Sequence, residues 1–198
     1  MQPAPGLEAI LGIVRSHRPE VHPTELSRRR AATALTLHEG DIGPEILFML
    51  RTKRPGDRWS GQMALPGGRW DPGDPDLVTT ARRETFEEVG VELPPPVGRL
   101  DDQGARVAPV IVSTFVFTVD DRPDVVLDPR EAEDAVWIPV AHLLDPVAAV
   151  AYPYEGIGVF HGIRYGRFTV WGLTLHTLES FFDLLGHELP RPAGITLT

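Results

Sequence analysis

Three glutamates, Glu84, Glu87 and Glu88, are the residues of this chain whose types and spacing are best suited to chemistry. An α-helix turns by about 100° per residue, so positions i, i+3 and i+4 lie on one face and would bring the three carboxylates together. Like charges at this spacing destabilise a helix by roughly 0.2–0.5 kcal/mol per pair, and by more where water is partly excluded. Mg²⁺ or Mn²⁺ in front of the carboxylates would reverse that effect, because both ions prefer oxygen ligands. The spacing therefore predicts a divalent metal site suited to bridging phosphates and activating water.

The residues around the glutamates favour this interpretation over a solvated acidic helix face. The pair Gly67 and Gly68 precedes the helix, and glycine lets backbone approach a ligand closely, so a carbonyl of this turn is a further candidate ligand. Arg83 is adjacent to Glu84 and lies four positions before Glu87, where it can orient a carboxylate by a charged hydrogen bond.

A helix over residues 75–89 positions the carboxylates. Asp74 is suited to cap its N-terminus, Pro75 suits its first position, and Gly90 suits the left-handed residue that follows its end. An apolar stripe beside the glutamates packs on a sheet and leaves the carboxylates at the rim of a cleft; its members are Val78, Ala81, Thr85 and Val89.

The rest of the chain predicts strands before, between and after helices. Helices are expected over residues 7–17, 140–144 and 173–185, and a hairpin within 149–172. Strands are expected over residues 31–37, 46–51, 63–65, 110–119 and 135–139. The strand over 110–119 is expected to bend or break near Ser113. This order is typical of the α+β class, with a mixed β-sheet flanked by helices.

Composition excludes several functional classes. The 198 residues contain no cysteine, which excludes disulfides, thiolate catalysis and cysteine zinc sites and suits a cytoplasmic protein. A net charge of −9 favours a small-molecule partner over long nucleic acid, which is usually bound by a basic face. No apolar run approaches the roughly 18 residues of a membrane span.

The string from Gly67 to Val91 resembles the Nudix box, Gly-x5-Glu-x7-Arg-Glu-U-x-Glu-Glu-x-Gly-U, where U is apolar. The matching residues are Gly68, Arg83, Glu84, Glu87, Glu88, Gly90 and Val91. The resemblance implies an α/β/α sandwich and metal-dependent hydrolysis of a nucleoside diphosphate linked to another group. It also implies that Glu84, Glu87 and Glu88 hold Mg²⁺ or Mn²⁺, that Gly67 contributes a carbonyl, and that Arg83 supports Glu84. The general base differs among members of the family and stays open.

Two departures from the box are informative. Asp74 stands where the first glutamate is usual, and eight residues rather than seven separate it from Arg83. Asp74 is therefore either a helix cap or a further base or metal ligand. The longer spacing is similar to the coenzyme A diphosphatase branch of the family, which residues 61–68 and 170–174 also resemble. The loop over 54–59 does not keep that branch's arginine and histidine spacing, so the substrate stays open.

Other candidates lie outside the helix. Glu131 and Glu133 precede the strand at 135–139, where family members often place a carboxylate that reaches the metals, and either is a possible base or ligand. The candidates for binding phosphates or stacking on a base are Arg51, Arg58, Trp59 and Arg69.

These observations predict a metal-dependent diphosphatase that hydrolyses the P–O–P bond of coenzyme A or acyl-CoA. The alternatives are a Nudix hydrolase of ADP-ribose, dinucleotides or nucleotide sugars, and a non-catalytic Nudix sensor that binds a nucleotide. The expected organisation is an N-terminal helix and linker over 1–29, a Nudix domain over 30–188 that includes the C-terminal helix, and a tail over 189–198. A monomer or a homodimer is expected.

Overall fold

The structure of the chain is a computed structural model that describes residues 3–23, 29–56, 59–104, 109–154 and 157–193. Its elements, in chain order, are α1 (Leu7–Ser16), β1 (Arg30–Gly40), β2 (Gly43–Arg51), β3 (Met63–Ala64), β4 (Gly67–Arg69), α2 (Leu77–Val89), β5 (Gly98–Arg99), β6 (Gln103–Gly104), β7 (Ile111–Val119), β8 (Ala132–Pro139), α3 (Val140–Leu143), η2 (Pro146–Ala148), β9 (Ala149–Tyr154), β10 (Gly158–Tyr165), β11 (Phe168–Trp171) and α4 (Gly172–Leu184). None of the helices in these ranges has the length and hydropathy needed to cross a membrane.

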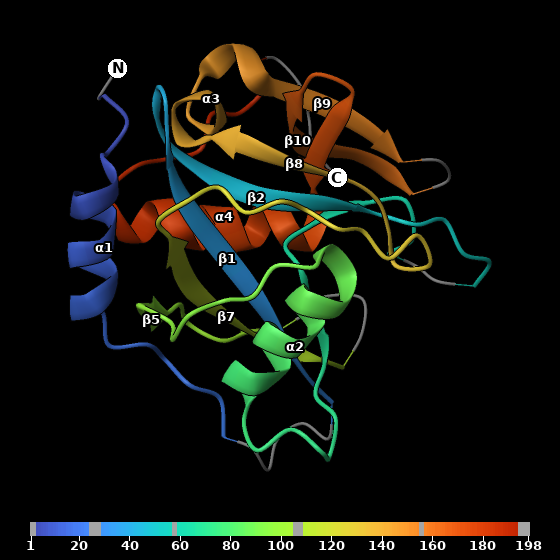
Figure 1. Cartoon of the computed structure of the whole chain (residues 1–198). Coiled ribbons are helices and arrows are strands. Elements are labelled where there is room, and N and C mark those ends of the chain that lie inside the picture. Colours follow the sequence, from blue (N-terminus) through green and yellow to red (C-terminus); the bar gives the residue numbers. More distant parts are fainter. Residues whose placement is uncertain (1–2, 24–28, 57–58, 105–108, 155–156, 194–198) are drawn as a thin grey trace.

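The main sheet is mixed, as the sequence predicts, and β1 is its centre. β1 pairs with β7 in parallel and with β2 in the antiparallel sense, and the order along the sheet is β3-β2-β1-β7-β5. Figure 1 shows α2 on one face of this sheet and α4 behind the other, with α1 beside the sheet. β4 pairs with one end of β1, so the glycine pair lies directly beneath α2. The α+β class and the Nudix-type sandwich are confirmed.

Alternation along β1 explains why the two faces carry different helices. Successive strand residues point to opposite faces. Leu35 and Leu37 belong to the core that includes α1 and α4, whereas Ala32 and Ala34 belong to the core that includes Ala81 of α2. Because alanine side chains are short, α2 packs close to the sheet, and its carboxylates lie near the backbone of β4.

Two expectations about the elements are wrong, and one is confirmed and extended. β7 runs unbroken past Ser113, in continuous parallel register with β1. The hairpin expected within 149–172 is confirmed, since β9 and β10 pair in the antiparallel sense, and β11 adds a third strand to it. Finally, α2 begins at Leu77 and is capped by Asp76, whose side chain accepts from the Thr79 N–H at 2.7 Å, so Asp74 is not the cap. The left-handed end of α2 is confirmed, since Gly90 has φ 72°.

A buried carboxylate, Asp102, ties the N-terminal segment to the sheet. It accepts hydrogen bonds from the His22 N–H at 3.0 Å, from Arg30 at 3.1 Å and from Ser113 at 2.6 Å, and it also pairs with Arg99. Burial alone raises the pKa of Asp102, but the hydrogen bond from Ser113 and the charge of Arg99 outweigh it and hold the pKa below its ordinary value. The folded state therefore favours the ionised carboxylate.

The substitution Asp102→Asn should lower the free energy of unfolding by about 3 kcal/mol at neutral pH, because it leaves two arginines beside a site without its negative charge. The lowered pKa means that this contribution is present above the unfolded value of about 4 and is lost as the pH falls below it. Urea denaturation from pH 7 down to pH 3 measures the difference. The gap from the unsubstituted chain should be constant near neutrality and should narrow below about pH 4.

Asp121→Asn is the matched control, since Asp121 is exposed on the loop after β7. Its effect should stay within about 0.5 kcal/mol. Equal effects of the two substitutions would show that Asp102 does not hold the N-terminal segment.

Candidate active site

Glu88 is the most deeply buried of the three box glutamates, with 2% of the residue exposed. Its Oε2 accepts a hydrogen bond from the Gly67 N–H at 2.8 Å, and its Oε1 lies 3.5 Å from Nη1 of Arg51. Burial raises the pKa of Glu88 to about 8, against the lowering effects of Gly67 and Arg51, and the charges of Glu84 and Glu131 raise it further. Without a cation beside it, the protein therefore favours the protonated form of Glu88 near neutral pH.

Glu84 lies one helical turn before Glu88 and faces the same glycine strand. A Cβ added to Gly68 would lie 2.4 Å from the Glu84 carboxylate, so this carboxylate rests directly on the Gly68 backbone. Gly67 is equally constrained, because it has φ 148° and a Cβ there would lie 2.3 Å from the carbonyl oxygen of Ala32. Burial raises the pKa of Glu84 as well, despite its neighbour Arg83. Both glycines therefore leave room that side chains would fill.

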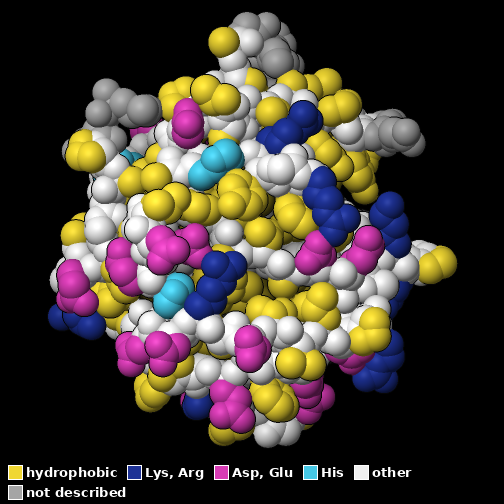
Figure 2. Space-filling view, turned by 45° about the horizontal axis from the view of Figure 1, so that its top comes forward, with side chains coloured by type: hydrophobic (Ala, Val, Ile, Leu, Met, Phe, Trp, Pro, Cys, Tyr) yellow, Lys and Arg dark blue, Asp and Glu magenta, His cyan; other side chains and the backbone are white. Residues whose placement is uncertain are grey.

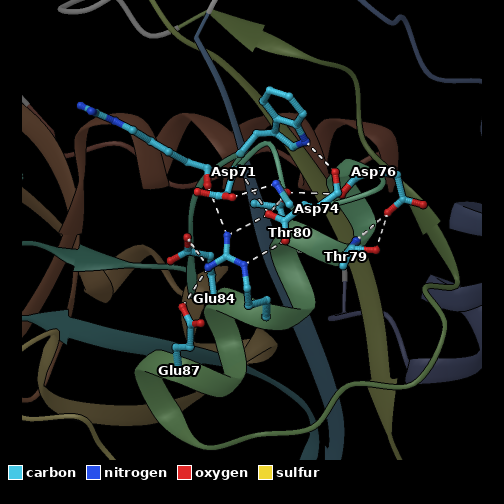
Figure 3. Close-up of polar contacts among 11 residues, drawn as sticks. Asp71, Asp74, Asp76, Thr79, Thr80, Glu84 and Glu87 are labelled. Carbon is cyan, nitrogen blue, oxygen red and sulfur yellow. Dashed lines mark hydrogen bonds and ion pairs between the residues drawn. The ribbon is translucent and has the colours of Figure 1, made fainter.

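Arg83 joins three carboxylates through one guanidinium. Its Nε and Nη2 donate to the two oxygens of Asp74 at 3.0 and 2.9 Å, and its Nη1 lies 3.0 Å from Glu84 and 2.8 Å from Glu87. Figure 3 shows Asp74, Glu84 and Glu87 converging on this group, with Thr80 donating to Asp74. The hydrogen bonds from Arg83 lower the pKa of Asp74 to about 2, and those to Asp74 raise the pKa of Arg83.

This arrangement divides the predicted carboxylates into two groups. Asp74 and Glu87 bind Arg83, and the Glu87 side chain is 54% exposed. Glu84 and Glu88 instead line a cavity of about 380 Å³, together with Glu131. Asp74 and Glu87 are not part of its wall.

The cavity combines charged and apolar walls. Arg29, Arg51 and Arg69 line it with the three carboxylates, while β3, β7 and α4 contribute apolar side chains, which include Met63, Val112 and Leu173. Such a mixture suits a ligand with an anionic centre and a less polar arm.

The other predicted residues are placed as follows. Arg51, Trp59 and Arg69 line the cavity, as does Glu131, which pairs with Arg54 at 2.8 Å. Glu133 is exposed on β8 and is not part of the wall. Arg58 lies outside the described residues.

Sequence reasoning missed the contribution of α4 and of Arg29. Thr174 and Thr177 line the cavity from the first turns of α4, and Thr174 donates to the Met63 carbonyl at 3.0 Å. The available signal was the likeness of residues 170–174, which include Thr174, to the coenzyme A diphosphatase branch, and Thr177 lies three positions further along the same helix. Nothing in the sequence places them opposite residues that are more than 80 positions earlier.

The donors at this site fit a hard divalent cation. The buried Glu88 and the partly buried Glu84 supply carboxylates whose pKa values are raised mainly by burial, and a cation beside them would favour their ionised forms. Gly67, which the resemblance implies as a carbonyl ligand, pairs with β1 beside them. In the described ranges, no group of three or more histidine, aspartate or glutamate side chains is already arranged around one metal position. Glu87 is held by Arg83 and would have to leave it to join the other two.

Comparison with known proteins identifies the family. Residues 27–154, more than half of the chain, match the family described as the NUDIX domain. The chain therefore belongs to the Nudix family and is a Nudix pyrophosphohydrolase, as the box predicts.

The relatives support the predicted branch. The chain is 34% identical over 176 residues to the mitochondrial coenzyme A diphosphatase NUDT8 of Homo sapiens, covering 77% of this chain and 69% of that protein. The Mus musculus protein of the same name is 29% identical over 171 residues, covering 76% of this chain and 75% of that protein. An uncharacterized protein of Schizosaccharomyces pombe is 39% identical over 112 residues, and the chain spans only 34% of its length. The resemblance to the coenzyme A diphosphatase branch is confirmed.

Among solved structures, a MutT/nudix family protein from Enterococcus faecalis superposes with a TM-score of 0.56 and 15% identity. The match covers 92% of this chain and 70% of that one, and at this identity it shows the fold alone.

Gly68→Ala should disturb the site with little effect on stability. Gly68 has no positive φ, so the only cost is contact between the new Cβ and the Glu84 carboxylate, which is the movable end of a side chain. We expect a change in unfolding free energy of about 1 kcal/mol or less and a fall of about tenfold or more in metal-dependent turnover, since a displacement of about 1 Å at a reacting centre is costly.

Gly104→Ala in β6 is the control, because a Cβ at Gly104 meets no atom of the described residues within 4 Å. Equal turnover of the two variants would show that the contact between Gly68 and Glu84 has no functional role.

Proposed function

We propose that this protein is a Mg²⁺- or Mn²⁺-dependent diphosphatase that hydrolyses the P–O–P bond of coenzyme A or an acyl derivative. The observation that carries the proposal is a pair of carboxylates, the buried Glu88 and the partly buried Glu84, facing a cavity that also holds three arginines. A site of carboxylates alone would repel a diphosphate. A site of arginines alone would bind a diphosphate without any carboxylate. The two together suit a diphosphate bound with a divalent cation.

Different side chains of the site have different roles in binding and hydrolysing the diphosphate. A divalent ion held by Glu84 and Glu88 supplies charge neutralisation and polarisation of the diphosphate oxygens. Arg51 and Arg69 are placed to bind phosphate oxygens, and Arg83 keeps Glu84 in position. The oxygen of water forms a bond to one phosphorus while the bridging P–O bond breaks, and the other phosphate leaves with the bridging oxygen.

A base must accept the proton of the attacking water. Glu131 supports this role because it lines the same cavity from a different segment and is not part of the helix. Its carboxylate pairs with Arg54 at 2.8 Å, which holds it at the edge of the cavity. A box glutamate is the alternative base.

The substrate assignment rests on likeness. The human and mouse relatives are named coenzyme A diphosphatases, and this chain shares the eight-residue spacing between Asp74 and Arg83 that is typical of that branch. The rival substrates are ADP-ribose, dinucleotides and nucleotide sugars, because the loop over 54–59 departs from the branch. A non-catalytic nucleotide sensor is the third possibility, and the retained glutamates of the box weigh against it.

The remaining predictions concern the partner, the cellular location, the oligomeric state and the domain division of the protein. Figure 2 shows acidic and basic side chains interspersed on one face, as suits a small-molecule partner better than long nucleic acid. A cytoplasmic location, a monomeric or homodimeric state, and the division into 1–29, 30–188 and 189–198 stay predictions. The names of the human and mouse relatives place those two proteins in the mitochondrion.

Incubation with Mg²⁺ and a panel of coenzyme A, ADP-ribose, a dinucleotide and a nucleotide sugar tests the proposal. We expect coenzyme A to yield 4′-phosphopantetheine and adenosine 3′,5′-bisphosphate by liquid chromatography with mass detection, and we expect a chelator to abolish the reaction. Cleavage of ADP-ribose with coenzyme A untouched would favour the rival substrates. No cleavage of any compound would favour the sensor.

Glu88→Gln should lower kcat/KM by about 100-fold or more, because a metal ligand contributes several kcal/mol of transition-state stabilisation. Glutamine keeps an oxygen that accepts from the Gly67 N–H, so folding should be preserved, which thermal unfolding measures. Glu92→Gln is the control and should keep full turnover, because Glu92 is exposed between the buried Val91 and Leu93 after α2. Full turnover in Glu88→Gln would overturn the assignment of this carboxylate.

A further inference from the structure

A second hollow adjoins the cavity of the candidate site. Lys53, Ser60, Tyr152 and Tyr154 line it, and Gln62 lines both spaces. The segment from Trp59 to Gln62 therefore forms the boundary between them, with Trp59 on the wall of the first and Ser60 on the wall of the second. We call this hollow the lysine–tyrosine groove. A ligand longer than a diphosphate can extend past Gln62 from one space into the other.

The charge of the groove differs from that of the cavity. Among the described residues, its charged lining consists of Lys53 and Arg54, without a carboxylate. Arg54 pairs with Glu131 at 2.8 Å, whereas Lys53, the single lysine of the sequence, is exposed and makes no ion pair with the described residues. The Lys53 stem lies against Gly61, where an added Cβ would meet the Lys53 Cγ and Cε at 3.1 Å. Within the described part of the chain, the groove thus presents one cation without an ion-pair partner.

The two tyrosines that line the groove pack against a tryptophan behind them. The Tyr152 and Tyr154 rings lie 4.9 and 4.6 Å from the Trp171 ring, and Trp171 is 8% exposed. Both tyrosines remain partly exposed on the side that lines the groove. Aromatic rings held in this way can stack on a heterocyclic base, and their hydroxyls and that of Ser60 can donate to an anion.

We propose that the lysine–tyrosine groove selects nucleotides that carry a phosphate outside the diphosphate bridge, with Lys53 binding that phosphate and the tyrosines contacting the base. The reaction at the bridge rests on the function proposed above, while binding in the groove is separately measurable. In coenzyme A the extra phosphate is the 3′-phosphate of the adenosine. ADP-ribose has none, so the groove would distinguish the two substrate classes that the cavity alone does not.

Isothermal titration with adenosine 3′,5′-bisphosphate and with adenosine 5′-monophosphate tests this proposal. The unsubstituted protein should bind the bisphosphate about tenfold more tightly, as expected for one charged hydrogen bond. Lys53→Met should bring the ratio of the two affinities close to one. Arg15→Met, on the exposed side of α1, removes the same charge far from the groove and should keep the ratio. Tyr154→Leu should weaken both ligands to a similar degree.

The outcomes test the binding proposal for the groove independently of the proposed reaction. The proposal for the groove would be wrong if the ratio of the two affinities is unchanged in Lys53→Met. It would also be wrong if the unsubstituted protein shows no preference for the bisphosphate. Both conclusions hold whether or not coenzyme A is cleaved. A ratio that falls in Lys53→Met but not in Arg15→Met would support the groove even if the turnover assay failed. In that case it is the proposed reaction, not the binding site, that is wrong.

Discussion

The contact of one guanidinium with three carboxylates is the interaction on which the site depends. Arg83 binds Asp74 and Glu87, which do not line the cavity, and it also contacts Glu84, so Glu84 and Glu88 are the helix carboxylates that face the cavity. The same contact with Asp74 fastens the turn between β4 and α2 to the helix. An acidic helix that would otherwise repel itself is thereby arranged with its negative charge directed at one place.

The sheet makes that arrangement possible by bringing the helix and the glycine strand together. Alanines on one face of β1 let α2 pack closely, and leucines on the other face form the core with α1 and α4. β4 then lies between β1 and the carboxylates, where only glycine leaves enough space. The result is a rigid acidic wall, with the arginines and the lysine–tyrosine groove on segments that come from elsewhere in the chain.

Local spacing predicted the parts of the site that depend on one helix. The common face of the glutamates, the contact between Arg83 and Glu87, and the end of α2 at Gly90 all follow from helix geometry. The role of Asp74 did not, because its partner is Arg83, nine positions later, and capping fell to Asp76 instead. Ser113 predicted a bend or break in the strand. Its hydroxyl instead donates a hydrogen bond to Asp102, and β7 continues past it. The threonines of α4 and the tyrosines of β9 reach their places only through tertiary packing.

Diffraction from a crystal soaked in Mn²⁺, with the anomalous signal of the metal, tests the central claim most directly. The account predicts a peak within about 2.0–2.6 Å of carboxylate oxygens of both Glu84 and Glu88, in the cavity and beside Gly67. A protein that binds no Mn²⁺ there, or binds it only through Asp74 or Glu87 on the far side of Arg83, would contradict the account.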